Sequence, residues 1–253
     1  LEDNSQAPAA KIENNQFTGA VGEAGVFSFN RHKTIQSGEG GILITNNKKI
    51  FLKSCLVRNH GECVVGPWNI KDISNTIGQN LRITEIQAAI AYHQFLKLTK
   101  LNKERVKLAN RISVGIKSIK GLSAPITRKN CSHVYYFYVM KYDEKKIGIK
   151  KEDFVRAVNA EGYYLRSGYL KPLYLEPIFQ KKICFGSNGF PFNYSKSNKK
   201  ISYNKGTAKV CENLNDNQVI LTNIISTPYN LRDMDGFVKA IKKVIANKDQ
   251  FKN

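Results

Sequence analysis

Two short apolar runs enclose a polar loop, and this pattern restricts the fold more than any other feature of the chain. Gly25–Phe29 and Gly41–Thr45 are rich in branched and aromatic residues and are too short for helices, so each is predicted to be a short buried strand. The loop between them carries Lys33.

Helical signals follow the second of these runs. Lys48–Val57 is predicted to be a helix, and another helix is predicted to begin after Thr84, which forms a capping box with Gln87. The helical pattern then continues, with breaks, toward Ile119. The apolar residues at the start of the second helix share one face: Ile86, Ala89 and Ile90.

The second half of the chain is predicted to form a separate domain, so that residues 1–120 and 121–253 are two domains. Val134–Met140 has the composition of a buried strand, and Lys151–Glu161 is an amphipathic helix that Gly162 ends. Gly168–Tyr203 is predicted to be a long loop. A closing amphipathic helix is predicted from the helical spacing of six apolar residues: Met234, Phe237, Val238, Ile241, Val244 and Ile245.

The net charge of the chain raises the question of whether it binds nucleic acid. Forty Lys and Arg residues against twenty Asp and Glu residues give a net charge of +20, which by itself suggests polyanionic partners. The lysines are scattered in ones and twos, however, and no motif that reads a nucleic-acid groove is recognisable. A lysine-rich solvated surface explains the charge better, and we expect no nucleic-acid partner.

Cysteine, histidine and hydropathy patterns argue against a disulfide-linked, metal-binding, membrane-spanning or secreted protein. The five cysteines form no Cys-x-x-Cys pair and the four histidines form no pair at helical spacing, so we expect free thiols and no metal site. No run approaches the roughly 18 to 20 apolar residues of a membrane span. Leu1–Ala10 does not have the composition of a secretory signal. We therefore expect a cytoplasmic protein without a membrane partner.

Four motifs in a fixed order are more specific than composition. Glu2-Asp3 with Gln6 comes first, and Phe27–Lys33, Gly38–Gly41 and Gly78–Arg82 follow. Together they resemble the DegT/DnrJ/StrS family of pyridoxal-phosphate-dependent sugar aminotransferases. The resemblance implies an α/β enzyme of fold type I, with the C-terminal part of the large mixed-sheet domain in residues 1–120 and the small α+β domain in residues 121–253. It also implies that the family's N-terminal part is missing from this chain.

Lys33 matches the lysine that holds pyridoxal phosphate in this family. A transaminase needs a primary amine that binds the cofactor covalently, yields to the amino donor and then moves a proton. Lys33 comes just after a predicted strand, on a loop that can hold an amine in one place. The alternative is one more surface lysine in a lysine-rich chain.

Two residues near the start match positions beside the cofactor ring. Pyridoxal phosphate acts as an electron sink only while its ring nitrogen stays protonated, which calls for a carboxylate. Asp3 matches that position, and Glu2 should face the other way because side chains alternate along an extended segment. The alternative is a pair of exposed acids. Gln6 matches the residue that lies beside the ring and its 3′ oxygen.

Two further residues match positions that bind the cofactor phosphate. Ser28 matches the family's phosphate-binding serine, although a strand-end hydroxyl can instead bond to the backbone. Asn80 matches an asparagine that reaches across a dimer interface to the partner's phosphate, so the resemblance implies a homodimer. The alternative for Asn80 is a turn residue that satisfies its own backbone.

The resemblance implies transfer of an amino group from an L-amino acid, glutamate or glutamine, to a ketone on a nucleotide-linked sugar or a cyclitol, in amino-sugar biosynthesis for cell-surface polysaccharide or related products. Relatives with histidine in place of the lysine perform a dehydration, so Lys33 favours transamination. Many members carry histidine where this chain has Tyr169 or Tyr174, which leaves the identity of the sugar open. The alternative is an inactive fragment or a non-catalytic, regulatory relative.

Overall fold

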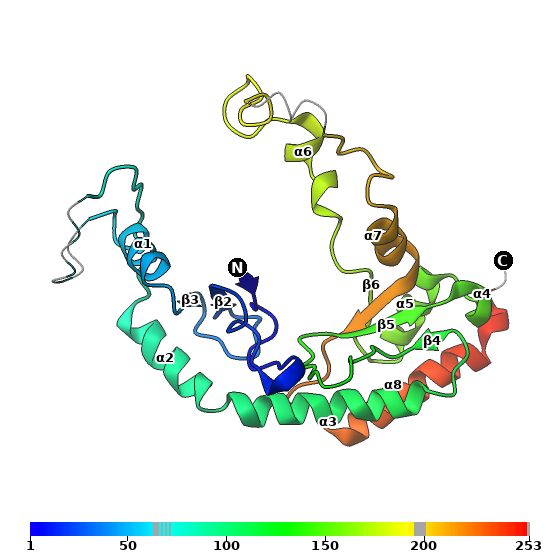
Figure 1. Cartoon of the computed structure of the whole chain (residues 1–253). Coiled ribbons are helices and arrows are strands. Elements are labelled where there is room, and N and C mark those ends of the chain that lie inside the picture. The colour runs from blue at the N-terminus through cyan, green and yellow to red at the C-terminus, as the bar shows by residue number, and fades with distance from the viewer. Residues whose placement is uncertain (63–65, 67, 69, 71, 195–200, 252–253) are drawn as a thin grey trace. The chain divides into compact units, whose positions relative to one another are not determined.

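The computed structural model describes residues 1–62, 66, 68, 70, 72–194 and 201–251. The chain divides into two compact units, which are described separately below (Figure 1). Unit 1 holds residues 1–107 and 126–136, and unit 2 holds residues 108–125 and the chain from residue 137 onward. Helix α3 (Leu98–Ile116) begins in unit 1 and ends in unit 2.

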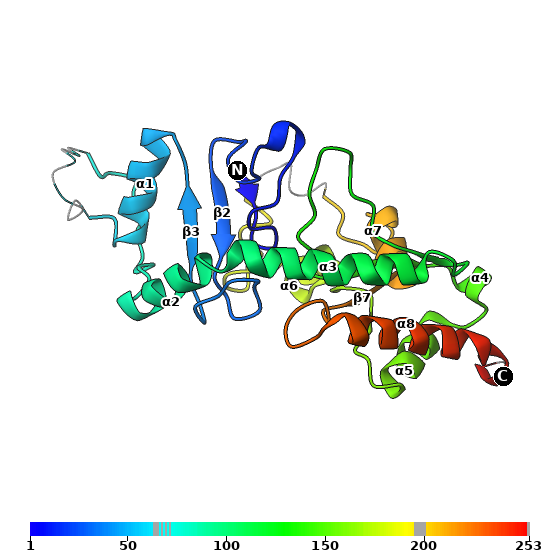
Figure 2. The ribbon, with the colours of Figure 1, turned by 90° about the horizontal axis from the view of Figure 1, so that it is seen from below.

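A three-stranded sheet organises unit 1, in the order β1 (Glu2–Asp3), β2 (Gly25–Ser28) and β3 (Gly41–Ile44) (Figure 2). Strand β1 pairs with β2 in parallel, and β3 pairs with β2 antiparallel. The predicted strands are confirmed in position. The prediction that β3 is buried is wrong, because β3 is an edge strand with a neighbour on one side only, and all four of its residues are exposed.

Capping side chains start the helices of unit 1. Helix α1 (Lys48–Arg58) begins after Asn47, whose side chain accepts hydrogen bonds from two backbone N–H groups. Helix α2 (Glu85–Phe95) begins at the predicted capping box, in which Thr84 and Gln87 bond reciprocally. The predicted break follows, since α2 ends at Phe95 and α3 starts at Leu98. A 3-10 turn, η1 (Glu13–Asn15), lies between β1 and β2 in the chain.

A four-stranded antiparallel sheet forms the centre of unit 2. Its order is β4 (Leu122–Ser123), β5 (Tyr138–Tyr142), β7 (Val219–Thr222) and β6 (Arg166–Ser167). The predicted strand at 134–140 is wrong in its first half. Tyr135 has a φ of +51°, a left-handed conformation that a strand cannot contain, so β5 begins later.

Two amphipathic helices cover the core of unit 2, and both confirm the prediction. Helix α5 (Lys151–Ala160) packs beside α8 (Leu231–Ala246) (Figure 2), and Phe154, Phe237 and Ile241 between them and the sheet are fully buried. Gly162 follows α5 with the predicted positive φ. The shorter helices of this unit are α4 (Glu144–Ile147), η2 (Leu173–Leu175), α6 (Pro177–Lys181), α7 (Lys209–Asn213), the π-helical turn η4 (Leu214–Gln218) and η5 (Lys248–Phe251).

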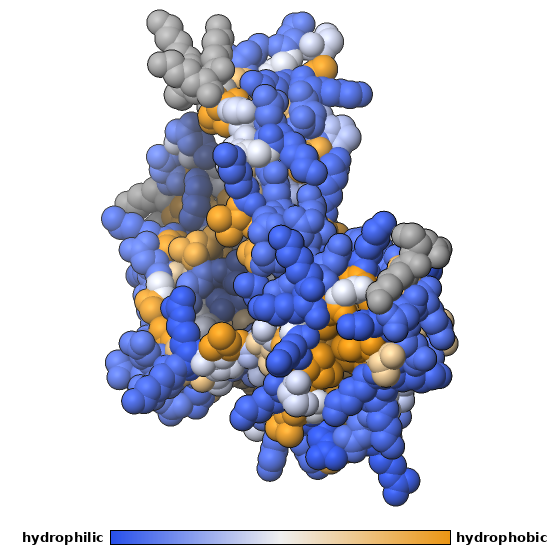
Figure 3. Space-filling model, turned by 90° about the vertical axis from the view of Figure 1, so that its right-hand side faces the viewer, coloured by the Kyte–Doolittle hydropathy of each residue, from blue (hydrophilic) through white to orange (hydrophobic). Residues whose placement is uncertain are grey.

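The segment predicted as one long loop, Gly168–Tyr203, contains two of these short helices, η2 and α6, and its residues 195–200 lie outside the described residues. The face of the molecule in Figure 3 is largely hydrophilic, with separate hydrophobic patches. This surface agrees with the lysine-rich composition of the chain.

Candidate active site

The loop between β2 and β3 is a hydrogen-bonded turn with a defined path. Phe29 N donates to Gly40 O at 2.9 Å, Arg31 N donates to Gly38 O at 2.7 Å, and Ser37 N donates to Phe29 O at 2.9 Å. Gly38 and Gly40 have φ values of +86° and +133°, which side-chain-bearing residues rarely adopt. The two glycines are therefore needed for the backbone path of this loop.

Lys33 lies on this loop with its backbone fixed and its side chain half-buried. Lys33 N donates to Asn30 O at 2.9 Å, and the next two residues, Thr34 and Ile35, are buried and anchor the loop. The Nζ of Lys33 lies 5.0 Å from the centroid of the Tyr136 ring. Among the described residues, no carboxylate lies within 4.0 Å of that Nζ. The amine is thus held against an aromatic face without an acidic partner.

Arg105 on α3 holds the backbone at Tyr136. The sequence did not predict Tyr136 as a site residue. The Nη1 of Arg105 donates to Tyr135 O at 3.1 Å and to Tyr136 O at 3.4 Å. Burial lowers the pKa of Arg105, whose guanidinium is partly withdrawn from solvent. The aromatic run at 134–140 is the sequence signal here, but its composition predicts a continuous strand and not a contact with Lys33.

Asp3 and Glu2 project to opposite sides of β1, as alternation predicts. Asp3 is exposed and pairs with Val26 in the sheet, whereas the Glu2 carboxylate is engaged with a neighbouring loop. That carboxylate accepts backbone hydrogen bonds from Gly19 N at 2.8 Å, Val21 N at 2.8 Å and Gly22 N at 2.5 Å. Glu2 therefore stabilises the neighbouring loop, and Asp3 takes no part in these three hydrogen bonds.

The electrostatics of Asp3 link it to Lys33. The pKa of Asp3 is lowered from its ordinary value, mainly by hydrogen bonds from Ser5 and also by the positive charge of Lys33. The backbone N–H of Ser5 donates to Asp3 Oδ1 at 3.0 Å. Asp3 is therefore a carboxylate at neutral pH. Gln6 lies exposed in the turn that follows.

Ser28 occupies the last position of β2, between the strand and the Lys33 loop. Its Oγ accepts a hydrogen bond from Asn30 N at 3.2 Å, which is the strand-end role that we considered as the alternative. A hydroxyl that accepts one hydrogen bond keeps its own hydrogen for another partner, so this contact does not prevent Ser28 from binding a phosphate.

Asn80 lies elsewhere in unit 1, exposed and opposite Asn59 in an isolated bridge. The Nε of Arg82 donates to Asn80 Oδ1 at 3.0 Å, and Arg82 Nη2 lies 3.1 Å from His60 Nε2. The carbonyl of the Asn80 amide is occupied in this way, whereas its N–H groups make no hydrogen bond that involves Arg82. Within the described chain, Asn80 makes no hydrogen bond with Lys33, Asp3 or Ser28.

The donor set fits a phosphorylated pyridine aldehyde. Lys33 supplies a primary amine, Asp3 supplies a carboxylate that is ionised, and Ser28 supplies a hydroxyl. The neighbouring Thr34 adds a buried Oγ1 that has no hydrogen-bond partner among the described residues. An amine, an anion and hydroxyl donors are the groups that pyridoxal phosphate requires.

The part of the chain that the structure describes holds neither a cluster of metal ligands nor a helix that could span a membrane. No three His, Cys, Asp or Glu side chains there come together as metal ligands would. No helix in that part has both the length and the hydropathy that crossing a membrane requires.

Known proteins show similar sequences and folds. The chain is 28% identical to the spore coat polysaccharide biosynthesis protein SpsC of Bacillus subtilis over 205 residues, which cover 78% of this chain and 52% of SpsC. The solved aminotransferase from Psychrobacter cryohalolentis matches with a TM-score of 0.79 at 21% identity, over 98% of this chain and 62% of the other.

A second structure matches in the same way. The putative sugar aminotransferase Spr1654 from Streptococcus pneumoniae, solved in its PLP form, matches with a TM-score of 0.74 at 16% identity, over 97% of this chain and 57% of the other. These structures have the mixed α/β fold of fold-type I aminotransferases. The chain spans about half the length of the curated relatives that it matches.

The family model described as the DegT/DnrJ/EryC1/StrS aminotransferase family matches residues 1–204, which include the Lys33 loop, Asp3, Ser28 and Asn80. Since this match covers most of the chain, the protein belongs to the DegT/DnrJ/EryC1/StrS aminotransferase family.

Proposed function

We propose that this chain forms the lysine-bearing part of a pyridoxal-phosphate-dependent aminotransferase. The enzyme transfers an amino group from an L-amino acid, glutamate or glutamine, to the ketone of a nucleotide-linked sugar or a cyclitol. The observation that supports this most is the position of Lys33. Its amine lies on a hydrogen-bonded loop against the Tyr136 ring, close enough to Asp3 for its charge to lower the pKa of that carboxyl.

The site residues have distinct tasks in this proposal. Lys33 binds the cofactor covalently and moves a proton at the substrate carbon, because its amine is primary and held in place. Asp3 accepts a hydrogen bond from the protonated ring nitrogen. Ser28 donates to the phosphate, and Gln6 orients the ring from the turn after β1. When bound, the cofactor supplies the electron sink that makes the substrate carbon acidic.

The proposal includes a homodimer. Asn80 is exposed and its amide N–H groups make no hydrogen bond that involves its own Arg82, so it can donate to a phosphate on another subunit. We infer a cytoplasmic enzyme of amino-sugar biosynthesis for cell-surface polysaccharide or related products. The name of SpsC, a polysaccharide biosynthesis protein, supports that assignment.

The test is turnover of the complete protein with an amino donor and a keto-sugar nucleotide. Replacing Lys33 with Ala or Arg is expected to abolish turnover while the circular dichroism spectrum and melting temperature stay unchanged. Lys53 lies on the exposed face of α1, so Lys53→Ala is the matched control and is expected to remain active. Turnover of Lys33→Ala within about tenfold of wild type would reject the proposal.

The alternative is an inactive fragment or a non-catalytic, regulatory relative. The exposed apolar side chains of β3 favour the first of these, an inactive fragment. Ile42, Leu43 and Ile44 are 48%, 39% and 37% exposed in this chain. The two hypotheses differ in cofactor binding. A chain that gives no absorption band with pyridoxal phosphate, although folded, would support the alternative.

A further inference from the structure

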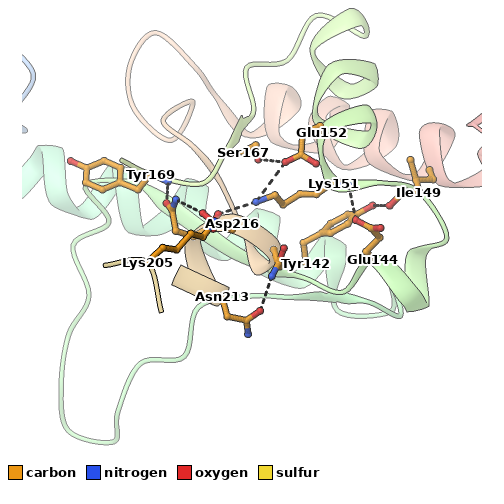
Figure 4. Close-up of polar contacts among 12 residues, drawn as sticks. Tyr142, Glu144, Ile149, Lys151, Glu152, Ser167, Tyr169, Lys205, Asn213 and Asp216 are labelled. Carbon is orange, nitrogen blue, oxygen red and sulfur yellow. Dashed lines mark hydrogen bonds and ion pairs between the residues drawn. The ribbon is translucent and has the colours of Figure 1, made fainter. Parts of the chain in front are cut away.

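Asn215, in the π-helical turn η4 of unit 2, binds two residues from distant segments of the chain, Lys151 and Tyr169. Figure 4 labels both of these residues and shows their polar contacts. Its side-chain Oδ1 accepts a hydrogen bond from Tyr169 N at 2.9 Å. Its main-chain oxygen accepts a hydrogen bond from Lys151 Nζ, also at 2.9 Å. One asparagine therefore connects α5 with the segment that carries Tyr169.

Lys151 is an unusual donor because its side chain is only 2% exposed. Burial lowers the pKa of this lysine, while Glu152, Asp216 and Glu144 act in the opposite direction. Its nearest carboxylate oxygen, on Glu152, lies 3.9 Å from Nζ. A buried ammonium is costly unless it is paired and hydrogen-bonded, so its place in the core calls for a specific acceptor.

The acceptor is a carbonyl near the end of a helix. The turn η4 ends at Gln218 and the chain enters β7 at Val219, so carbonyls of this last turn need donors from outside the helix. Lys151 supplies such a donor to Asn215. The hydrogen bond holds the backbone of the turn at Asn215, the residue whose side chain binds Tyr169 N and also donates to Asp216 Oδ1 at 3.3 Å.

Gly168 makes the contact with Asn215 possible. It has a φ of +62°, and a Cβ at this position would lie 2.9 Å from both the main-chain oxygen and the Oδ1 of Asn215. Gly168 N also donates to Val219 O at 2.8 Å. Two consecutive N–H groups, those of Gly168 and Tyr169, are therefore bound to the stretch 215–219.

The Tyr169 ring lies at the wall of an open hollow of about 810 Å³ in unit 2, lined also by Leu170, Thr207 and Leu214. The ring packs edge-on against Phe137, with centroids 5.5 Å apart, and the residue remains 38% exposed. A phenol ring with a fixed backbone offers an apolar face and a hydroxyl, which suits the C–H face and hydroxyl groups of a sugar.

We propose that Lys151 is a positioning residue, which acts through Asn215 to fix Tyr169 at the wall of this hollow for contact with the acceptor sugar. The identity of the acceptor rests on the proposed function, whereas the positioning of Tyr169 does not. The positioning of Tyr169 and its contact with the sugar are therefore tested by separate measurements.

Amide hydrogen exchange of the full chain tests the positioning. Lys151→Met and Asn215→Ala are each expected to raise the exchange rate of the Tyr169 amide by about tenfold or more, because its acceptor is displaced or removed. Lys150→Met is the matched control, since Lys150 is exposed and adjacent, and it is expected to leave the rate unchanged. Asn215→Ala keeps the main-chain carbonyl that Lys151 binds, so it remains informative if Lys151→Met does not fold.

Unchanged Tyr169 exchange in a folded Lys151→Met protein, or in Asn215→Ala, would overturn the proposal. In the complete enzyme, the same variants are expected to raise KM for the keto sugar about tenfold and to leave the amino-donor half-reaction within about twofold. Equal losses in both half-reactions would contradict the assignment to the acceptor. If wild type performs neither half-reaction, the proposed function fails, and the exchange rates alone decide the role of Lys151.

Discussion

The amine of Lys33 lies 5.0 Å from the centroid of the Tyr136 ring, and Arg105 of α3 holds the Tyr136 carbonyl. The contact joins a loop between two strands to a residue more than a hundred positions later in the chain. An aromatic face attracts an ammonium group weakly and in a defined direction. Tyr136 therefore limits the positions that the Lys33 amine can take. It does so through its ring and forms no ion pair with the amine.

The first prediction concerns Tyr136. Tyr136→Leu is expected to weaken the apparent affinity of the complete enzyme for pyridoxal phosphate by about tenfold, because the lysine loses its aromatic partner. Tyr136→Phe keeps the ring and is expected to stay within about twofold of wild type. Titration followed by absorbance measures both values. Equal affinities for the Leu and Phe variants would show that the ring does not act on Lys33.

The second prediction concerns Asp3. Asp3→Asn is expected to retain the cofactor but to lose turnover by several orders of magnitude, because a neutral amide does not hold the proton on the ring nitrogen. Glu13→Gln, an exposed acid-to-amide change in η1, is the control and should have no effect. Steady-state kinetics at saturating cofactor separate the two outcomes. Wild-type turnover of Asp3→Asn under those conditions would remove Asp3 from the mechanism.

The third prediction concerns Asn80 and the dimer. Mixing inactive Lys33→Ala subunits with weakened Asn80→Ala subunits is expected to restore activity in part of the population. In a mixed dimer both defects fall in one site if Asn80 acts across the interface, and the other site is intact. Mass spectrometry of the mixture verifies subunit exchange. Exchange without any recovered activity would place Asn80 in the site of its own subunit.

The fourth prediction concerns the core of unit 2. Phe237 on α8 is fully buried and its ring lies 5.8 Å from that of Tyr163. Phe237→Ala is expected to lower the free energy of unfolding by about 3 to 5 kcal/mol, through lost burial and the cavity that remains. Lys239→Ala on the exposed face of α8 is expected to change it by less than about 0.5 kcal/mol. Urea titrations provide both values, and a similar small effect for Phe237→Ala would contradict this packing.

The fifth prediction concerns alkaline stability. Burial and a hydrogen bond to Glu212 raise the pKa of Tyr174 from 10.0 to about 12. Because the folded pKa is the higher one, the stabilisation is complete below pH 10 and is lost as the pH rises through about 12. The difference in melting temperature between wild type and Tyr174→Phe should therefore shrink between pH 9 and pH 11. A constant difference would mean that the Tyr174 hydroxyl is not held in its protonated form.

Local patterns predicted much of the fold. The capping box at Thr84, the apolar stripe of α8 and the strand at Gly25 depend on neighbours in sequence, so they could be predicted from the residues alone. The place of strand β7 in its sheet could not be predicted in this way. Val219–Thr222 is a short apolar run that carries a local strand signal, but its place between β5 and β6 depends on residues far apart in the chain.

The candidate site was predictable only in part, for a similar reason. Lys33, Asp3 and Ser28 could be assigned because each lies in a short motif that resembles the family, and the strands that flank the Lys33 loop are local apolar runs. The contact of Tyr136 with Lys33 joins residues far apart in the chain, and the left-handed conformation of the preceding Tyr135 is one that composition does not indicate for an aromatic residue. The Lys151–Asn215 contact joins residues 64 positions apart, and a lysine is expected at the surface.

Reductive trapping tests the central claim most directly, namely that Lys33 holds the cofactor. The folded chain is mixed with pyridoxal phosphate, reduced with borohydride, digested and mapped by mass spectrometry. Borohydride converts a reversible link between the lysine and the cofactor into a stable one, so each modified residue can be identified. We predict stoichiometric modification of Lys33, with the other lysines modified only at trace level. Modification spread over many surface lysines, or concentrated on a lysine other than Lys33, would contradict the account.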